Sequence, residues 1–137
     1  MSFKAKFKAG STEYNVLDCK YHLFQEVDDT GRPSSVTRGG SITLTLESTN
    51  DTALFEWMCD HFGLKDGSVV FTKRDSEATM KELKFTNAYM VAYAEKFTAS
   101  TDAPMNMTVT LSAREITLGN GTHTNEWPDA GGSNGGR

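Results

Sequence analysis

One stretch of this chain has the periodicity of an α-helix, whereas most of the remainder alternates between polar and apolar residues. The stretch covers residues 50–62, NDTALFEWMCDHF. Its apolar residues recur at the i, i+3, i+4, i+7 spacing of a buried helix face. We therefore predict a single helix at about 50–62 with one stripe in the core: Leu54, Phe55, Met58, Cys59 and Phe62.

The opposite face of this predicted helix carries Trp57 together with Glu56 and Asp60. A large aromatic side chain on a polar face is typical of a contact with a partner. We therefore predict Trp57 as a subunit-interface residue. Asn50 or Asp51 is expected to cap the start of the helix, and Gly63 is expected to end it in a left-handed conformation.

Alternating segments predict strands before and after the helix. Phe3, Ala5 and Phe7 interleave with lysines, and residues 13–27 are rich in β-branched and aromatic side chains, so the first two strands are expected to form a hairpin. Further strands are predicted at about 41–48, 68–74, 79–93 and 105–114. The predicted fold class is therefore mainly β, with antiparallel strands and one helix.

Two of the later strands carry more specific expectations. In the strand at 79–93 the predicted shared face includes Leu83, Phe85, Tyr89, Val91 and Tyr93. In the last long strand the apolar residues move from odd to even positions after Ala113. A bulge or sharp bend near Arg114 and Glu115 would keep both sets of apolar residues in one core.

The segment 28–40, DDTGRPSSVTRGG, is too long for a tight turn between strands. Loops of this length in a compact domain are usually functional or disordered, and Arg32, Pro33 and Arg38 give this one contact chemistry that a linker would lack. We predict a long projecting loop that contacts neighbouring subunits and is poorly ordered without those contacts. Its candidate interface residues are Gly31, Arg32, Pro33 and Arg38, because arginine binds carboxylates in a bidentate manner and proline reduces the entropy lost on docking.

Composition favours one polar, mildly acidic domain of 137 residues, with 14 basic and 18 acidic side chains. A nucleic-acid partner is disfavoured by this balance. No run reaches the 18 apolar residues of a membrane span and none resembles a signal peptide, so we expect no membrane insertion and synthesis in the cytoplasm. We assign 1–128 to the domain and 129–137 to a flexible Gly-rich tail or an expression artefact.

The sequence gives little evidence of a catalytic or metal-binding site. Cys19 with His22 and Cys59 with His61 are the candidate pairs, but their spacing points each pair in different directions on a strand or a helix. The Gly-rich stretches lack the strand-to-helix context of a phosphate-binding loop. We predict no enzyme activity, no catalytic residues, no metal site and no cofactor.

Several longer stretches resemble one known family. They are GRPSSVTRGGSITLTLES at 31–48, LFEWM at 54–58, DGSVVFTKRDSEATMKELKFTNAY at 66–89, LSAREITLGNG at 111–121 and NEWP at 125–128. Together they resemble the haemolysin-coregulated protein family, the inner-tube proteins of the type VI secretion system, in a divergent subtype. The resemblance covers residues 2–128 and leaves the Gly-rich end outside it.

The resemblance implies a small closed β-barrel of antiparallel strands with one helix. It also implies six-membered rings that stack into a tube, with a contractile sheath, a spike protein and effector cargo as partners. It further implies secretion through the apparatus without a signal peptide. In the family, the long loop that matches 28–40 here reaches a neighbouring subunit or ring. Two alternatives stay open: a tube protein of a phage-like or extracellular contractile system, and a monomeric ligand-binding barrel with an apolar lumen.

Overall fold

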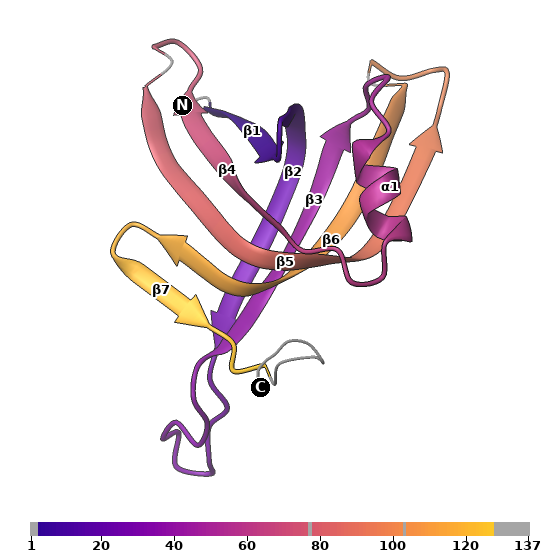
Figure 1. Ribbon diagram of the computed structural model, residues 1–137. Coiled ribbons are helices and arrows are strands. Elements are labelled where there is room, and N and C mark those ends of the chain that lie inside the picture. The colour runs from indigo at the N-terminus through magenta and orange to yellow at the C-terminus, as the bar shows by residue number, and fades with distance from the viewer. Residues whose placement is uncertain (1–2, 77, 103, 128–137) are drawn as a thin grey trace.

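The computed structural model describes residues 3–76, 78–102 and 104–127. The described residues form one short helix and a sheet of long strands (Figure 1). The elements in chain order are β1 (Phe3–Ala9), β2 (Thr12–Phe24), β3 (Arg38–Glu47), α1 (Ala53–Cys59), β4 (Lys65–Lys73), β5 (Thr79–Phe97), β6 (Met105–Leu118) and β7 (Gly121–Thr124).

The sheet closes on itself, which confirms the predicted mainly-β fold of antiparallel strands. Neighbouring strands follow the order β3-β2-β1-β4-β5-β6-β7, and an additional pairing of β3 with β6 joins the two sides into a ring. All these pairings are antiparallel, and β7 extends β6 as a hairpin beyond the ring. The predicted hairpin of the first two strands is confirmed by the β1–β2 pairs from Lys6–Asn15 to Ala9–Thr12.

Inward-facing residues of the ring form the core. Alternate positions point inward because successive side chains of a strand lie on opposite faces. The most deeply buried side chains are Phe7, Tyr14, Ile42, Leu44, Leu46, Val69, Leu83, Phe85, Val109 and Leu111. Phe7 stacks on Phe85 and tilts against Tyr14, with ring centroids 5.9 and 6.1 Å apart.

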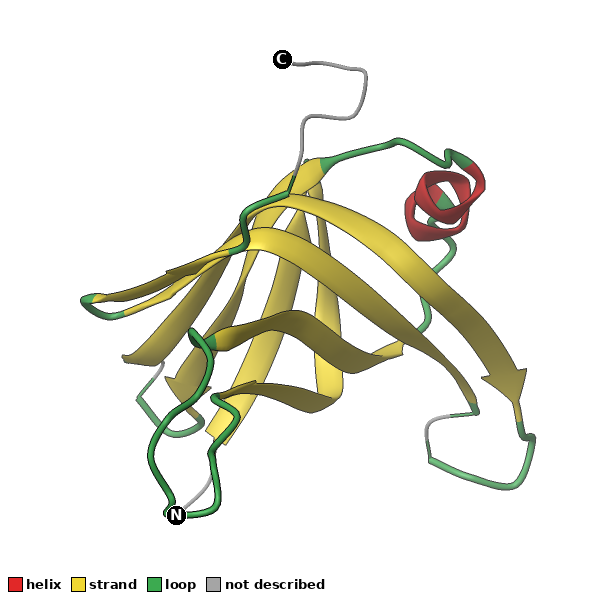
Figure 2. Cartoon of the chain, turned by 90° about the horizontal axis from the view of Figure 1, so that it is seen from below, coloured by secondary structure: helices red, strands yellow, loops and turns green. Residues whose placement is uncertain are grey.

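The two ends of the closed sheet differ. We call one the helix end, because α1 follows the end of β3 and precedes the start of β4 there. We call the other the open end; it extends from the start of β1, beside the turn between β4 and β5, to the end of β2, and in Figure 1 these two points lie at the upper left and at the bottom. Leu54 and Trp57 of α1 belong to the buried core cluster. Viewed from below, the helix lies beside the sheet at one end only (Figure 2).

The predicted helix was too long and its faces were assigned wrongly. The helix covers Ala53–Cys59, and Trp57 is only 3% exposed whereas Phe55 and Phe62 are 55% and 77% exposed. The indole Nε1 of Trp57 donates to the carbonyl of Gly63 at 2.9 Å, which satisfies its polar atom in the partly buried site. The buried face is therefore Leu54 and Trp57, with Met58 partly buried beside them.

The ends of the helix explain its shortness. Thr52 is the N-cap residue without a side-chain capping bond, although Asp51 Oδ1 accepts from the Ala53 N–H at 2.6 Å. At the other end Asp60 is already extended, with ψ of 100°. Gly63 is absent from the glycines that have a positive φ, so the predicted left-handed termination there is wrong.

The predicted face of the strand at 79–93 was wrong at Tyr89 and Val91, whereas Tyr93 packs against the core as predicted, beyond a register shift between Met90 and Ala92. Leu83 and Phe85 are buried, but the next buried positions are Ala88 and Met90, so the phase changes by one residue. Asn87 lies between them with φ of +52°, a left-handed conformation that Asn tolerates better than most residues. Its N–H bonds to Asp66 Oδ1 at 2.8 Å.

The last long strand changes phase at the expected place. Ala113 and Ile116 are both buried, although they are three residues apart. The pairing of β6 with β3 ends at Ser112, and its pairing with β7 begins at Glu115. The change of phase thus coincides with a change of partner strand. The predicted tail at 129–137 lies outside the described residues.

Candidate assembly surfaces

A connection of 13 residues, 25–37, joins β2 to β3 and projects from the open end (Figure 1). We call it the arm. The predicted loop of 28–40 was shifted by three residues at each end, since β3 already begins at Arg38. In Figure 1 the arm extends away from the ring, and residues 26–34 are exposed.

Asp28 organises the tip of the arm. Its Oδ1 accepts from the N–H and hydroxyl of Thr30, at 2.9 and 2.7 Å, and from the N–H of Arg32 at 3.1 Å. Bonds from the Thr30 hydroxyl and from the Thr30 and Arg32 N–H groups lower the pKa of Asp28 below its ordinary value of 3.8. Gly31 takes φ of +88°, which glycine adopts without the usual cost.

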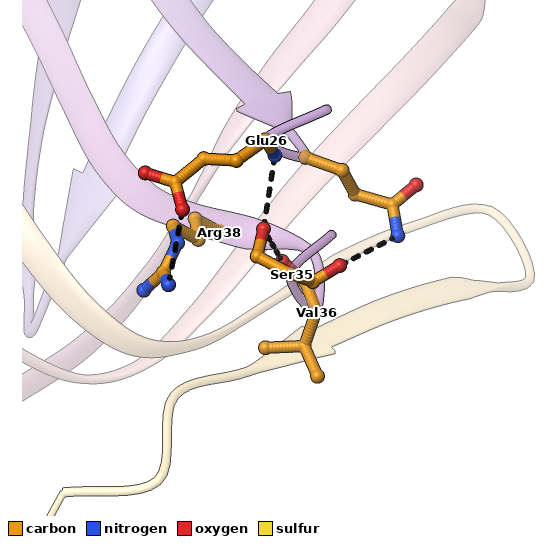
Figure 3. Close-up of polar contacts among 5 residues, drawn as sticks. Glu26, Ser35, Val36 and Arg38 are labelled. Carbon is orange, nitrogen blue, oxygen red and sulfur yellow. Dashed lines mark hydrogen bonds and ion pairs between the residues drawn. The ribbon is translucent and has the colours of Figure 1, made fainter. Parts of the chain in front are cut away.

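Side chains from the two sides of the arm bond to each other at its base, next to β2 and β3 (Figure 3). Ser35 Oγ accepts from the N–H of Glu26 at 2.9 Å, and the Glu26 carboxylate lies 3.6 Å from Arg38. Val27 and Pro33 form an isolated β-bridge between base and tip. These bonds give the arm a defined shape in the single chain, in contrast to the predicted disorder.

The structure brings together four of the five residues predicted at an interface. Gly31, Arg32 and Pro33 lie near the tip of the arm, and Arg38 lies at its base, paired with Glu26. Trp57 lies in the core under α1, so the exposed indole on which its interface role depended does not exist. That Gly31, Arg32, Pro33 and Arg38 contact another subunit stays a prediction.

Large apolar side chains are exposed at both ends of the molecule. The open end and the arm expose Phe3, Leu23, Phe24, Val27, Val36 and Met80. The helix end exposes Phe55, Phe62, Leu64, Phe97 and Met105. Phe55 is held edge-on against Tyr93 at 5.6 Å, and Phe62 lies against His61 at 6.2 Å. Two such groups at opposite ends are surfaces that protein partners commonly cover.

The open end is hollow because β1 and β2 separate there. Their pairing stops at Lys6–Asn15, whereas β1 stays paired with β4 as far as Phe3–Lys73. The gap leaves a cavity of about 370 Å³, which we call the open-end cavity; its lining residues are Phe3, Cys19, Tyr21, Phe71, Met80 and Lys81. Burial, and to a smaller extent the charge of Asp18, raises the pKa of the Cys19 thiol to about 11.

A second cavity of about 520 Å³ adjoins the first, since Tyr21 lines both. Leu23, Leu83, Ile116 and Leu118 form its apolar wall, and His22 and His123 also line it. No group of three or more metal-ligating side chains occurs among residues 3–76, 78–102 and 104–127. Within these same ranges no helix is long and apolar enough to cross a membrane.

One structural residue escaped the sequence analysis. Asn125 Nδ2 donates to the carbonyls of Gly39 and Ala113, at 3.0 Å each, where β3 and β6 part. Its Oδ1 bonds to Nε2 of the half-buried His123 at 3.0 Å. The glycine pair at 39–40 is the sequence signal of this close approach.

Comparisons with known proteins agree with the geometry. The family model described as Hemolysin coregulated protein Hcp (TssD) matches residues 1–128. The structure of Hcp1 from Flavobacterium johnsoniae is 51% identical, covers 89% of this chain and 99% of its own, and superposes with a TM-score of 0.85. A search of curated proteins returned no match.

More distant solved structures share the fold. Hcp1 from Salmonella typhimurium is 14% identical, with a TM-score of 0.70 over 90% of this chain and 93% of its own. The sheath/tube terminator structure of an extracellular contractile injection system, PVC, is 18% identical, with a TM-score of 0.53 over 84% of this chain and 92% of that one. On the evidence of its sequence and its closed sheet, the chain belongs to the haemolysin-coregulated protein (Hcp, TssD) family of tube proteins.

Proposed function

We propose that this protein assembles with itself into six-membered rings that stack into the inner tube of a contractile type VI secretion apparatus. The observation that carries the proposal is the arrangement of exposed apolar groups at opposite ends of one small domain. Contacts between two different surfaces of the same chain are head-to-tail. Contacts between opposite ends continue in one direction, which fits stacking of successive copies; the six-membered ring is proposed from membership of the haemolysin-coregulated protein family.

The arm supports this proposal because it is shaped before any partner binds. Asp28 fixes its tip, and the Glu26–Arg38 pair and Ser35 fix its base. A segment that is already ordered loses less entropy on docking than a flexible one. Val36, at 76% exposed, and Arg32 are then the side chains that meet a neighbouring subunit.

As the tube component, the protein would be assembled in the cytoplasm and leave the cell through the apparatus. Its partners would be a contractile sheath, a spike protein at the tip and effector cargo. No catalytic step is assigned to the chain. The proposal is consistent with its membership in a family of tube proteins, and the related injection-system structures share its fold.

Light scattering after size exclusion, together with negative-stain electron microscopy, tests the assembly. The wild-type protein at micromolar concentration is expected to give a particle of six chains with a central hole. A monomer of 15.1 kDa at every concentration would contradict the proposal.

A pair of matched variants tests the arm. Val36→Ser removes an exposed apolar group from the arm, and Val91→Ser removes the same group from the middle of β5, where it is 52% exposed. Circular dichroism should be unchanged in both. We expect Val36→Ser to reduce subunit association or stacking more than Val91→Ser does; an equal effect would remove the arm from the proposal.

An extracellular contractile system is the second candidate function. The PVC structures favour it only through the fold, at 18% identity. The 51% identity to Hcp1 of Flavobacterium johnsoniae favours the type VI system.

A further inference from the structure

We infer that the open-end cavity of one subunit receives the side chain of Phe62 from the helix end of a second copy, and that this contact runs along the tube. The inference rests on the proposed self-assembly. It adds the two surfaces that meet between successive copies.

The cavity is suited to an aromatic side chain. Phe3, Tyr21, Phe71 and Met80 supply apolar walls around about 370 Å³. Two of these walls, Phe3 and Met80, are 45% and 43% exposed, so apolar surface remains for a guest to cover. Burial raises the pKa values of Cys19 and Tyr21 beside it, which is the behaviour of groups on a weakly hydrated surface.

Phe62 is the side chain best placed to enter such a cavity. It is 77% exposed, the largest exposed fraction among the large apolar residues of the described chain. It follows the last turn of α1, where its only ring contact within the described residues is with His61. Aromatic side chains that move from water into an apolar cavity often contribute most of the binding free energy of an interface.

The positions of Phe62 and the open-end cavity in the fold also favour this contact. Phe62 follows α1 at the helix end, and residues of β1, β2, β4 and β5 line the cavity at the open end. The helix end of one copy can therefore face the open end of a copy displaced along the closed sheet. A contact between opposite ends repeats in one direction without closing. It therefore fits stacking of successive copies, whereas ring closure requires contacts on the sides.

One segment at each end carries a net charge of opposite sign, −3 for residues 51–66 and +1 for residues 73–84. The helix-end segment 51–66 carries Asp51, Glu56, Asp60 and Asp66 against Lys65 alone. The open-end segment 73–84 carries Lys73, Arg74, Lys81 and Lys84 against Asp75, Glu77 and Glu82. Lys81 itself lines the cavity, and Asp60 precedes Phe62 by two residues. Opposite charges around an apolar centre set the register of an interface and steer association.

Cys19 makes the contact testable by cross-linking, because it lines the cavity. In a Cys59→Ser background, Phe62→Cys places a second thiol at the proposed contact. Assembled protein is oxidised with copper phenanthroline at a pH of about 9, since the raised pKa of Cys19 slows reaction at neutral pH. Each copy then carries both partners of the disulfide, so we expect a ladder of covalent dimers, trimers and longer chains.

Two matched controls define the result. Adding Cys19→Ser should reduce the ladder to dimers at most, because only position 62 then remains. Phe97→Cys, in place of Phe62→Cys, offers a thiol at another helix-end position that is 66% exposed and should give no ladder. Assembled rings and tubes without the 19–62 ladder would overturn the inference and leave the proposed function standing. Protein that forms no assembly at all would overturn both.

Truncation gives an independent measurement that needs no cross-link. Phe62→Ala should raise the concentration at which stacked tubes form by about tenfold or more, as for a dominant interface aromatic. Phe97→Ala should change it little. Equal effects of the two variants, or none for Phe62→Ala, would contradict the inference.

Discussion

Gly40 and Asn125 occupy the same small space: a Cβ atom on Gly40 would lie 2.5 Å from Asn125 Nδ2 and 2.7 Å from the carbonyl oxygen of Ala113. Gly40 also has φ of +102°, which side chains of L-residues rarely allow. The amide of Asn125 uses this space to bond to Gly39 and Ala113. This contact connects the segment after β7 to the point where β3 and β6 separate.

Asn125→Ala is expected to destabilise the fold by about 1–3 kcal/mol, because two carbonyl oxygens lose their donor in a partly buried site. Asn125→Asp should be no better, since a carboxylate cannot donate to either carbonyl. Urea denaturation measures both. If Asn125→Ala unfolds at the wild-type midpoint, the contact contributes nothing to stability.

Gly40→Ala should cost a similar amount, about 1–3 kcal/mol, from backbone strain and the clash with Asn125. Combining Gly40→Ala with Asn125→Ala removes the clash with the amide but keeps the strain. The double variant should therefore be more stable than the sum of the two single effects predicts. Strict additivity would show that the two residues do not compete for space.

Trp57→Ala is expected to lower the free energy of unfolding by about 3–5 kcal/mol, because the indole is buried in the core cluster. Phe55→Ala should cost about 1 kcal/mol, since that ring is 55% exposed and mainly contacts Tyr93. Guanidinium denaturation at a fixed protein concentration compares the two, because assembly also contributes to apparent stability. A larger loss for Phe55→Ala would restore the helix faces predicted from periodicity.

The two cysteines should differ in reactivity toward a maleimide or iodoacetamide. Cys59 is exposed and should react first. Cys19 has a pKa of about 11, so its thiolate fraction at pH 8 is roughly a thousandth, and its rate should rise about tenfold for each pH unit below that pKa. Peptide mass spectrometry separates the two sites. In urea both should react at similar rates; equal rates in the folded protein would contradict the burial of Cys19.

Asp28→Ala should speed amide hydrogen exchange at Thr30 and Arg32, because their N–H groups lose the Oδ1 acceptor. Asp28→Asn keeps a side-chain oxygen at the same place and should preserve much of the protection. The other amides of the sheet serve as the internal reference. Unchanged exchange in Asp28→Ala would show that the tip of the arm is held by other contacts.

Acid should act on the same carboxylate. The pKa of Asp28 in the folded chain lies below its ordinary value of 3.8, so its bonds stabilise the arm fully above pH 3.8. That contribution is lost as the pH falls through the lowered folded pKa. Exchange at Thr30 and Arg32 should therefore accelerate, relative to the reference amides, only in strong acid, and a loss already at pH 6 would contradict this assignment.

Alternation along the chain was sufficient to predict β1 to β6, the antiparallel hairpin at the start and the long connection after the second strand, but it did not predict β7. These features depend on local pattern, because a strand exposes alternate residues to two different environments wherever it lies. The change of phase near Ala113 and Ile116 was visible for the same reason. The length of 28–40 likewise required a projecting segment, although its boundaries moved by three residues.

The tertiary structure alone decided which face of each element is buried when the pattern permits two answers. In a helix of two turns, periodicity cannot say whether Phe55 or Trp57 faces inward; the Gly63 carbonyl that satisfies the indole decides for Trp57. In β5 the left-handed turn of Asn87 reverses the face after Phe85. The Asn125 contact and the open-end cavity both arise between segments far apart in sequence, where no local pattern records which atoms will meet.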